Sequence, residues 1–282
     1  MNHHLSRRAA VKSTVFGLLA ASIPNISFAK TIQDFTEANP ELPLRYPSID
    51  DSIVNEVVGK SHFDLETVKK LVDKRPELAR ATWDWGFGDW ESAIGAASHV
   101  GRRDIVGYLM SKGARPTLFT YAMLGCYEVV KEVIESLPNS QTTMGPHGIS
   151  LFSHAKAGLR MKDTLGAEEI SNSERLIEYL QKLGNADSSN YLEMTEDKSM
   201  YLGDYIYGEG ENDGFSIKLN MRDNIALGKL GKFGGALHKV EDNKFIYNGI
   251  TSVFITFQFQ NNKVVSLTVT EPDLVLVAKK VN

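Results

Sequence analysis

Residues 97–116 read ASHVGRRDIVGYLMSKGARP, and this stretch decides the fold. Small residues lead to a turn at Gly101, after which apolar residues recur at the spacing of an amphipathic helix. The same pattern returns as YAMLGCYEVVKEVI over residues 121–134, with its turn at Gly125, and again around Gly158. The chain therefore contains a repeated unit of helix, turn and helix.

An earlier copy is recognisable although its turn glycine is missing. From Asp50 onward, apolar residues stand at helical spacing on both sides of Phe63, which occupies the turn position. The turn positions Phe63, Gly101, Gly125 and Gly158 follow one another at intervals of 38, 24 and 33 residues. Because stacked helices must stay in register, we expect these differences to lie in the connecting segments, or fingers. The finger before the second unit should be enlarged.

The last unit carries a polar insertion at residues 160–173, after which its second helix is expected to resume at 174–186. Over about residues 50–187 the units resemble the ankyrin repeat, most closely in the second and third copies. That resemblance implies a curved helical solenoid of about four repeats. Because the period of apolar residues changes only near Ser189, we expect β structure only after the solenoid. The concave side of such a solenoid commonly holds a protein or peptide.

Past Ser189 the period of apolar residues changes from helical to two, which predicts β-strands. Alternating segments such as 253–259 and 264–269 are separated by turns rich in Asn and Asp, and we expect seven or eight short antiparallel strands. The region resembles the lipocalin-like module appended to many secreted bacterial serine hydrolases, an accessory domain whose presence implies no reaction. The predicted fold class is α + β in separate domains, with a linker at 188–199 and a small antiparallel β-barrel or sandwich at 200–282.

Residues 1–29 have the pattern of an export signal. Arg7 and Arg8 precede an apolar run that Ser-Phe-Ala closes as a small-residue cleavage site. The segment resembles a bacterial twin-arginine signal, but Ala10 stands where a bulky aromatic residue is usual, so the general secretion route stays open. The apolar run is well short of the roughly 20 residues that span a bilayer. We expect an extended lead-in at 30–49 and a periplasmic or secreted protein without a membrane span.

Composition excludes several classes of function. The formal net charge of −4 becomes −7 without residues 1–29, which hold three basic and no acidic residues, and an acidic surface disfavours nucleic acid and anionic membranes as partners. Cys126 is the only cysteine, so an internal disulfide is excluded. With 42% apolar residues the chain can build two cores, and we expect a monomer.

All three tryptophans fall within residues 83–91, WDWGFGDWE, on the finger that should be enlarged. The rings either fold back as a roof over the first two repeats or form a platform for a partner, because so much aromatic area is unfavourable in water. Carboxylates at Asp84, Asp89 and Glu91 stand between the rings and would suit a cationic or sugar-like ligand. We expect Asp89 or Glu91 to cap the helix that follows.

Three histidines, His99, His147 and His154, lie nearest the expected groove. Their separations match no known metal spacing and no cysteine supports them, so we expect hydrogen-bonded packing, with no metal and no other cofactor. The sequence also lacks a phosphate-cradling Gly-rich loop, a Gly-x-Ser-x-Gly elbow and a His-Glu-x-x-His motif. These features predict a protein that is not an enzyme.

The sequence therefore predicts a non-catalytic, exported binding protein that holds a protein or peptide on the concave side of its helical repeats. The residues expected to contact that partner lie on the tryptophan finger and at the three histidines: Trp83, Asp84, Trp85, Phe87, Asp89, Trp90, His99, His147 and His154. The alternative is a small-ligand receptor or an enzyme, with its pocket at the finger or inside the β domain.

Exchange of Arg7 and Arg8 for lysine tests the export route. The twin-arginine pathway reads the arginine pair and not only its charge, so the double substitution should leave the precursor in the cytoplasm. Cell fractionation with immunoblotting measures the outcome. Unimpaired export of the lysine variant would instead assign the chain to the general secretion route.

Overall fold

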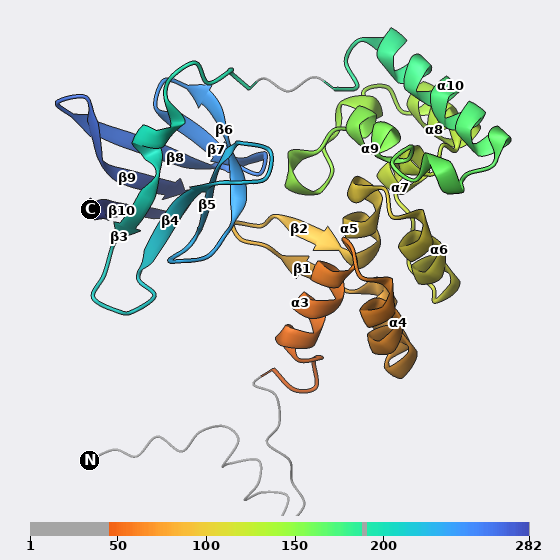
Figure 1. Cartoon of the computed structure of the whole chain (residues 1–282), viewed down its shortest axis with the longest axis horizontal. Helices are drawn as coiled ribbons and strands as arrows, with labels where there is room; N and C mark the ends of the chain where they lie inside the picture. Colours follow the sequence, from red (N-terminus) through yellow and green to blue (C-terminus); the bar gives the residue numbers. More distant parts are fainter. Residues whose placement is uncertain (1–44, 188–190, 282) are drawn as a thin grey trace, which may run out of the picture. The chain divides into compact units, whose positions relative to one another are not determined.

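The computed structural model describes residues 45–187 and 191–281 of the 282-residue chain (Figure 1). The predicted export signal, the lead-in up to residue 44 and residues 188–190 of the predicted linker lie outside the described residues. Within the described residues, a helical N-terminal region is followed by an antiparallel β-barrel. The prediction of α and β structure in separate regions is therefore confirmed at this level.

The helical region is built from α-helices joined by turns and single 3₁₀ segments. The described α-helices are α3 (Asp51–Lys60), α4 (Leu65–Lys74), α5 (Ala93–Val100), α6 (Arg103–Ser111), α7 (Leu118–Met123), α8 (Tyr127–Ser136), α9 (Leu151–Ala157) and α10 (Ala167–Leu183). The 3₁₀ segments are η1 (Pro76–Arg80), η2 (Ser140–Thr142), η3 (Pro146–Gly148) and η4 (Lys162–Thr164).

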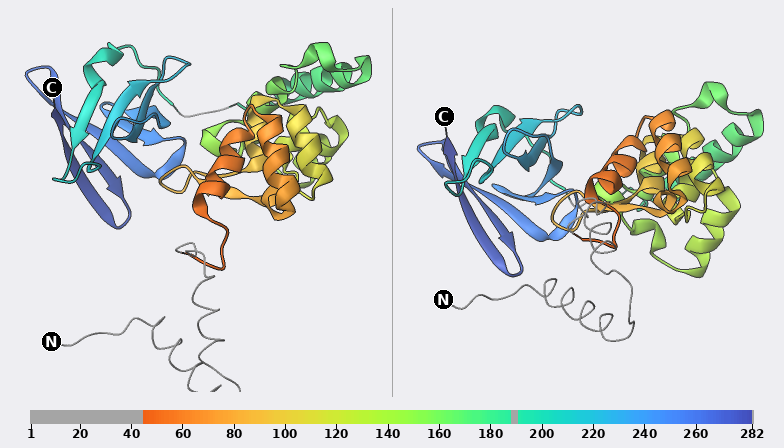
Figure 2. Two further views of the ribbon diagram at one scale, coloured as in Figure 1. Left: turned by 60° about the horizontal axis from the view of Figure 1, so that its bottom comes forward. Right: turned by 90° about the horizontal axis from the view of Figure 1, so that it is seen from below.

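Successive helices form pairs, and the first helix of each pair packs on the first helix of the next. Thus α3 contacts α5, α5 contacts α7, and α7 contacts α9, while α4 contacts α6 and α8 contacts α10 (Figure 2). Phe63, Gly101 and Gly125 lie between paired helices, where their spacing predicts them. Aliphatic side chains from both helices of the pairs are buried: Val57, Val68, Ile94, Ile105, Leu109, Val130, Leu151 and Leu176.

Two glycines allow neighbouring helix pairs to approach closely. Gly101 ends α5 in the left-handed conformation (φ 79°), and a Cβ atom there would lie 2.1 Å from the carbonyl oxygen of Ala157. A Cβ atom at Gly158 would lie 2.0 Å from the carbonyl oxygen of Met123. Any side chain at either position would push two helix pairs apart.

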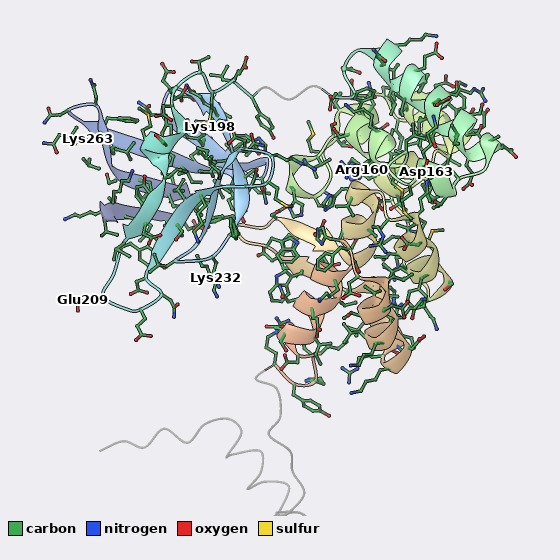
Figure 3. The ribbon with its side chains drawn as sticks, in the orientation of Figure 1. Arg160, Asp163, Lys198, Glu209, Lys232 and Lys263 are labelled. Carbon is green, nitrogen blue, oxygen red and sulfur yellow. The ribbon has the colours of Figure 1, made fainter. Side chains whose placement is uncertain are left out.

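Arginine side chains bridge these turns. Arg102 donates from Nη1 to the carbonyl oxygen of Phe63 in a neighbouring turn. Arg160, labelled in Figure 3, donates from Nη1 to the carbonyl oxygen of His99 at 3.3 Å. Carbonyls left free at helix ends thus receive donors from another helix pair.

The expectation that β structure occurs only after the helices is wrong. Two short antiparallel strands, β1 (Thr82–Asp84) and β2 (Trp90–Ser92), lie between η1 and α5 and form the enlarged finger. Gly86, Phe87 and Gly88 all have positive φ and close the loop between them. Glycine adopts positive φ without steric cost, so the chain can reverse here, and the three residues of β1 then pair with the three of β2.

The predicted start of the last helix is also wrong. The second helix of the last unit begins at Ala167 and includes much of the segment expected to be an insertion. The side chain of Glu169 accepts a hydrogen bond from the backbone N–H of Gly166 at 2.9 Å, and acidic residues in the first turn favour the positive end of the helix dipole. The polar composition of this segment hides the start of α10, which is stabilised by the acidic residues of its first turn.

The C-terminal region is a closed barrel preceded by η5 (Lys198–Tyr201). Its strands are β3 (Gly203–Ile206), β4 (Gly214–Leu219), β5 (Ile225–Lys229), β6 (Gly235–Glu241), β7 (Lys244–Tyr247), β8 (Ile250–Gln260), β9 (Lys263–Glu271) and β10 (Leu274–Val281). Each pairs antiparallel with its neighbour in the sequence, and β10 closes the barrel on β3. The predicted seven or eight antiparallel strands are confirmed.

Aromatic side chains fill the interior of the barrel. The largest fully buried ones are Tyr201, Tyr205, Phe245 and Phe257. Their rings meet edge to face, with 4.8 Å between the ring centroids of Tyr201 and Phe257. An eight-stranded barrel has an interior just wide enough for side chains, so these rings make a packed core.

The helical region and the barrel belong to one compact unit, Asp51–Asn282. Contacts between the two regions involve the turn between β7 and β8, which touches the finger and the loop that contains η3. Among the described residues, no helix is both long and apolar enough to cross a membrane.

Replacement of Gly101 by alanine should destabilise the fold far more than the same change at Gly184. Both glycines have left-handed backbones (φ 79° and 75°), so each substitution costs about 1 kcal/mol of strain. Only at Gly101 does the new Cβ meet a carbonyl oxygen, whereas nothing lies within 4 Å at Gly184. We expect a free energy of unfolding about 2 kcal/mol lower for Gly101→Ala than for Gly184→Ala, measured by urea denaturation. Equal losses would contradict the close packing at Gly101.

Candidate metal centre

The finger is a β-hairpin whose alternation sorts the side chains of β2 onto two sides. Glu91 faces inward and is fully buried, whereas its neighbour Trp90 has 63% of its surface exposed. The indole Nε1 of Trp85 donates a hydrogen bond to Oε2 of Glu91 at 2.8 Å. At the tip, Oδ1 of Asp84 accepts a hydrogen bond from the backbone N–H of Gly86 at 2.8 Å. The hairpin therefore presents the buried carboxylate of Glu91 to the helices.

Neither acidic residue before α5 caps that helix. Ser92 is the N-cap, and its hydroxyl accepts a hydrogen bond from the backbone N–H of Gly95 at 3.1 Å. The expectation that Asp89 or Glu91 would be the cap is wrong, because the serine directly before the helix takes that place. Both carboxylates turn inward instead and are buried, a location that charged residues occupy only when they are paired.

Three imidazoles surround the carboxylate of Glu91, and we call these four residues, His62, Glu91, His99 and His147, the three-histidine cluster. Nε2 of His99 lies 3.0 Å and Nε2 of His147 3.3 Å from Oε1 of Glu91. Nε2 of His62 lies 3.4 Å from Oε2. One potential ligand atom from each residue falls within 4.8 Å of all the others. The four side chains come from the turn after α3, from β2, from α5 and from η3.

Two of the imidazoles are fixed by hydrogen bonds at Nδ1, the ring nitrogen that faces away from Glu91. Nδ1 of His62 lies 3.0 Å from the carbonyl oxygen of Gly59, and Nδ1 of His147 lies 2.6 Å from Oδ2 of Asp89. The backbone N–H of His147 also donates to Oδ1 of Asp89 at 3.0 Å, and the residue has a left-handed backbone with φ 60°. Because both acceptors need a proton on Nδ1, each ring turns its Nε2 toward Glu91.

At His62 this hydrogen-bond pattern sets an acceptor against an acceptor. A neutral His62 with its proton on Nδ1 offers Glu91 only a lone pair at Nε2, and a carboxylate likewise offers only lone pairs, whereas the raised pKa of His147 keeps protons on both of its nitrogens in the metal-free protein. Oε1 of Glu91 and Nε2 of His99 are buried and share no properly directed hydrogen bond, although they are 3.0 Å apart. An unsatisfied buried polar atom costs roughly 1–3 kcal/mol. Protein groups alone satisfy the cluster poorly, as is expected of ligands that share a cation.

Electrostatic interactions keep the carboxylate of the cluster ionised. Burial alone would raise the pKa of Glu91, but the adjacent His147 and His99 outweigh it and hold that pKa well below its usual range. Burial would lower the pKa of His147, but Asp89 and Glu91 raise it to about 9. For His99 burial prevails and lowers the pKa, so this imidazole is a neutral base at pH 7.

Several residues singled out in the sequence lie in or against the cluster: Trp85, Asp89, His99 and His147. His154 does not join them. Its Nδ1 lies 2.8 Å from the carbonyl oxygen of Ser150, and its ring centroid is 6.4 Å from that of His99. It is a buried neighbour of the cluster and not one of the four convergent groups.

The remaining finger residues divide between two environments. Trp83 and Phe87 are half-buried, and the ring of Phe87 packs edge to face on Tyr247 with 5.0 Å between centroids. Trp90 is largely exposed, and Asp84 shapes the tip of the hairpin. One side of the finger thus covers the cluster, while the other presents a single tryptophan to solvent.

His62 and Glu91 are the two members of the cluster that the sequence pattern does not bring together with the other histidines. His62 stands one residue before the turn position Phe63, and His99 stands two before Gly101. Alignment of the units by their turns would have placed both histidines at the ends of neighbouring first helices. Glu91 carries no comparable signal, because an acidic residue beside a helix start is usually a cap.

Comparison with known proteins offers no guide to these residues. No family model, no curated protein and no solved structure matches the chain. The resemblances to ankyrin repeats and to lipocalin-like modules remain predictions from sequence pattern.

The loss of folding stability at acid pH should depend on His154. Burial lowers the pKa of His154 to about 4, from an ordinary value near 6.5. The unfolded chain therefore binds the proton more tightly, and the stabilisation is present above pH 6.5 and lost as the pH falls toward 4. The loss is on the order of 3 kcal/mol at its limit.

Urea denaturation of chelator-treated protein between pH 7 and pH 4 measures this loss. His154→Gln, which cannot titrate, should lose stability less steeply than the wild type over this range. Parallel profiles for the two proteins would show that His154 does not contribute in this way.

Proposed function

We propose that the chain is a metal-binding protein and that His62, Glu91, His99 and His147 hold one divalent transition-metal ion. The observation that carries the proposal is the convergence of three imidazole Nε2 atoms on one fully buried carboxylate. Metal-bound histidines usually donate their other ring N–H to a carboxylate or a carbonyl. The acceptors behind His62 and His147 are of these two kinds.

The spacing of the ligand atoms suits a small tetrahedral ion. Metal to ligand bonds of about 2.0–2.1 Å place the corners of a tetrahedron roughly 3.3–3.4 Å apart. Nε2 of His99 and Nε2 of His147 lie 3.0 and 3.3 Å from Oε1 of Glu91, Nε2 of His62 lies 3.4 Å from Oε2, and one ligand atom from each residue falls within 4.8 Å of the others. The two separations from Oε1 are close to a tetrahedral edge, and the wider ones would have to shorten as an ion entered.

The donor set indicates the class of metal. Calcium and magnesium prefer oxygen ligands, and three imidazoles with one carboxylate oxygen do not supply them. Imidazole suits zinc, copper, iron and nickel, and zinc takes a tetrahedral set of nitrogen and oxygen ligands without a geometric preference of its own. We therefore propose zinc or a metal of similar size and softness as the occupant.

A structural role is better supported than a catalytic one. With Glu91 as the fourth ligand a tetrahedral ion has no open position, and catalytic zinc sites keep one open for water or substrate. Oε2 of Glu91 is held by Trp85, which leaves Oε1 as the ligand atom. The ion would tie the finger to three other segments, so part of its binding energy would be folding energy.

Partner binding remains a proposal for the surface around this centre. The consecutive packing of α3, α5, α7 and α9 supports the interpretation of these units as ankyrin-like. Trp90, 63% exposed on the outer side of the finger, supports a protein or peptide partner there. In this view the metal fixes the finger that presents the tryptophan, and the predicted export signal would place the protein in the periplasm.

Metal uptake tests the proposed function directly. Chelator-treated wild-type protein should bind one equivalent of Zn²⁺ in isothermal titration calorimetry. At a zinc concentration 100 times the Kd, its free energy of unfolding should rise by about 2.7 kcal/mol. His62→Gln and Glu91→Gln each remove a ligand, and should weaken binding by more than the roughly 10- to 100-fold loss typical of an outer partner.

Two further variants control for the loss of a buried histidine. His238 lies on β6, is half-buried with its Nε2 out of solvent, and is not one of the convergent groups, so His238→Gln should leave the zinc Kd unchanged. His154→Gln should also retain zinc, because His154 lies outside the ligand set. Wild-type protein that takes up neither Zn²⁺ nor Co²⁺ would overturn the proposal, and so would normal uptake by the His62 and Glu91 variants.

A further inference from the structure

We infer that Asn248, in the turn between β7 and β8, is a positioning residue for the metal centre, so that metal binding and the docking of this barrel turn are thermodynamically coupled. The inference rests on the proposed function and names how that site is controlled. It gives the barrel a role in the affinity of a centre whose direct ligands all come from the helical region.

The carboxylate of Asp89 is the connection between the barrel and the cluster. Oδ2 of Asp89 accepts hydrogen bonds from Nδ1 of His147 at 2.6 Å and from Nδ2 of Asn248 at 2.7 Å. Oδ1 accepts the backbone N–H of His147 at 3.0 Å. Asp89 is 3% and Asn248 5% exposed, so water is a poor substitute for either partner. The barrel thus supplies one of the donors that fix the carboxylate behind His147.

The amide of Asn248 is itself held in one orientation. Its Oδ1 accepts a hydrogen bond from the backbone N–H of Ala236 at 2.6 Å, and its backbone N–H donates to the carbonyl oxygen of Ala236 at 2.8 Å. The oxygen of the amide is therefore committed to the barrel. The NH₂ group is the part that faces Asp89, as a donor to a buried carboxylate must.

Neighbouring residues hold the same turn against both parts of the site. The hydroxyl of Tyr247 donates to the carbonyl oxygen of Trp85 at 3.3 Å. On the other side, a Cβ atom at Gly249 would lie 2.8 Å from Cα of Gly148, so the two backbones meet with no room for a side chain. The turn between β7 and β8 therefore contacts the finger and the η3 loop, which carry Glu91 and His147.

Coupling follows from these contacts. Without the hydrogen bond from Asn248, the buried carboxylate of Asp89 loses one of its donors and can rotate. His147 then loses the fixed acceptor at its Nδ1 that orients its Nε2 toward Glu91. If the attached turn strengthens metal binding, the bound metal must strengthen attachment of the turn by the same factor. Anything that pulled the turn away would then lower the affinity for metal.

The substitution Asn248→Asp tests whether the barrel turn affects the affinity for metal. Aspartate keeps the oxygen that accepts from Ala236 but replaces the donor by a negatively charged oxygen opposite Asp89. We expect the Kd for Zn²⁺, measured by calorimetry on the full chain, to rise by about 10- to 100-fold, and by less for Asn248→Ala. Asn243→Asp is the matched control: the same change in the neighbouring turn, also at positive φ, should leave the Kd unaltered.

Hydrogen exchange of the wild type tests the reverse direction and does not depend on the folding of any variant. Addition of Zn²⁺ should slow amide exchange in the segment 247–249 relative to the barrel turn at 261–262, which lies between β8 and β9. A purely structural role for Asn248 would lower the melting temperature of the metal-free protein. It would leave both the zinc Kd and the zinc-dependent exchange unchanged.

The outcomes separate the two proposals. Wild-type protein that binds no metal fails the proposed function, and the coupling fails with it. Wild-type protein that binds zinc through His62 and Glu91, with an unchanged Kd in Asn248→Asp and no zinc-dependent protection at 247–249, keeps the metal centre and overturns the coupling alone.

Discussion

A carboxylate that water does not reach must be compensated by the protein or by a bound ion, and Glu91 imposes this requirement on the region around it. The effective cost of burying an ion is several kcal/mol even after relaxation, comparable with the net stability of a whole domain. The turn after α3, the last turn of α5, the finger and η3 each bring a polar group to this one side chain. The positions of these four segments are therefore constrained by the need to surround the one buried charge of Glu91 with polar groups.

The same residue joins local structure to the site. In the finger, Trp83 pairs with Glu91 and Asp84 with Trp90, so alternation sends Glu91 inward and Trp90 to solvent. A slip of one residue in this register would bury the tryptophan and expose the carboxylate. Ser92, the next residue, caps α5 and fixes where the helix begins. Strand register, helix start and the buried charge are thus set within three consecutive residues.

The sequence predicts the fold where a periodic pattern extends over many residues. The helical units, the turns at Gly101 and Gly125 and the alternating strands of the barrel are of this kind. The strands of the finger are too short for a period to show, and the start of α10 is hidden by polar composition. For the site, His99, His147 and Asp89 stand out as candidates, but the convergence of His62 and Glu91 with them depends on how helix pairs stack, which no local pattern encodes.

Charge balance indicates which occupant the cluster suits. Asp89 and Glu91 bring two carboxylates to three imidazoles. Protons on the rings could balance them, but the centroids of His62 and His147 lie only 4.9 and 5.2 Å from that of His99, so neighbouring imidazolium rings would repel at short range. Each proton at Nε2 would also fill a lone pair that points to the centre. One divalent cation supplies two positive charges at the point where those lone pairs meet, and it leaves the Nδ1 protons on the acceptors behind the rings. Metal binding would therefore displace the proton that the raised pKa of His147 keeps on that ring in the metal-free protein, and it would leave the hydrogen bonds behind the rings in place.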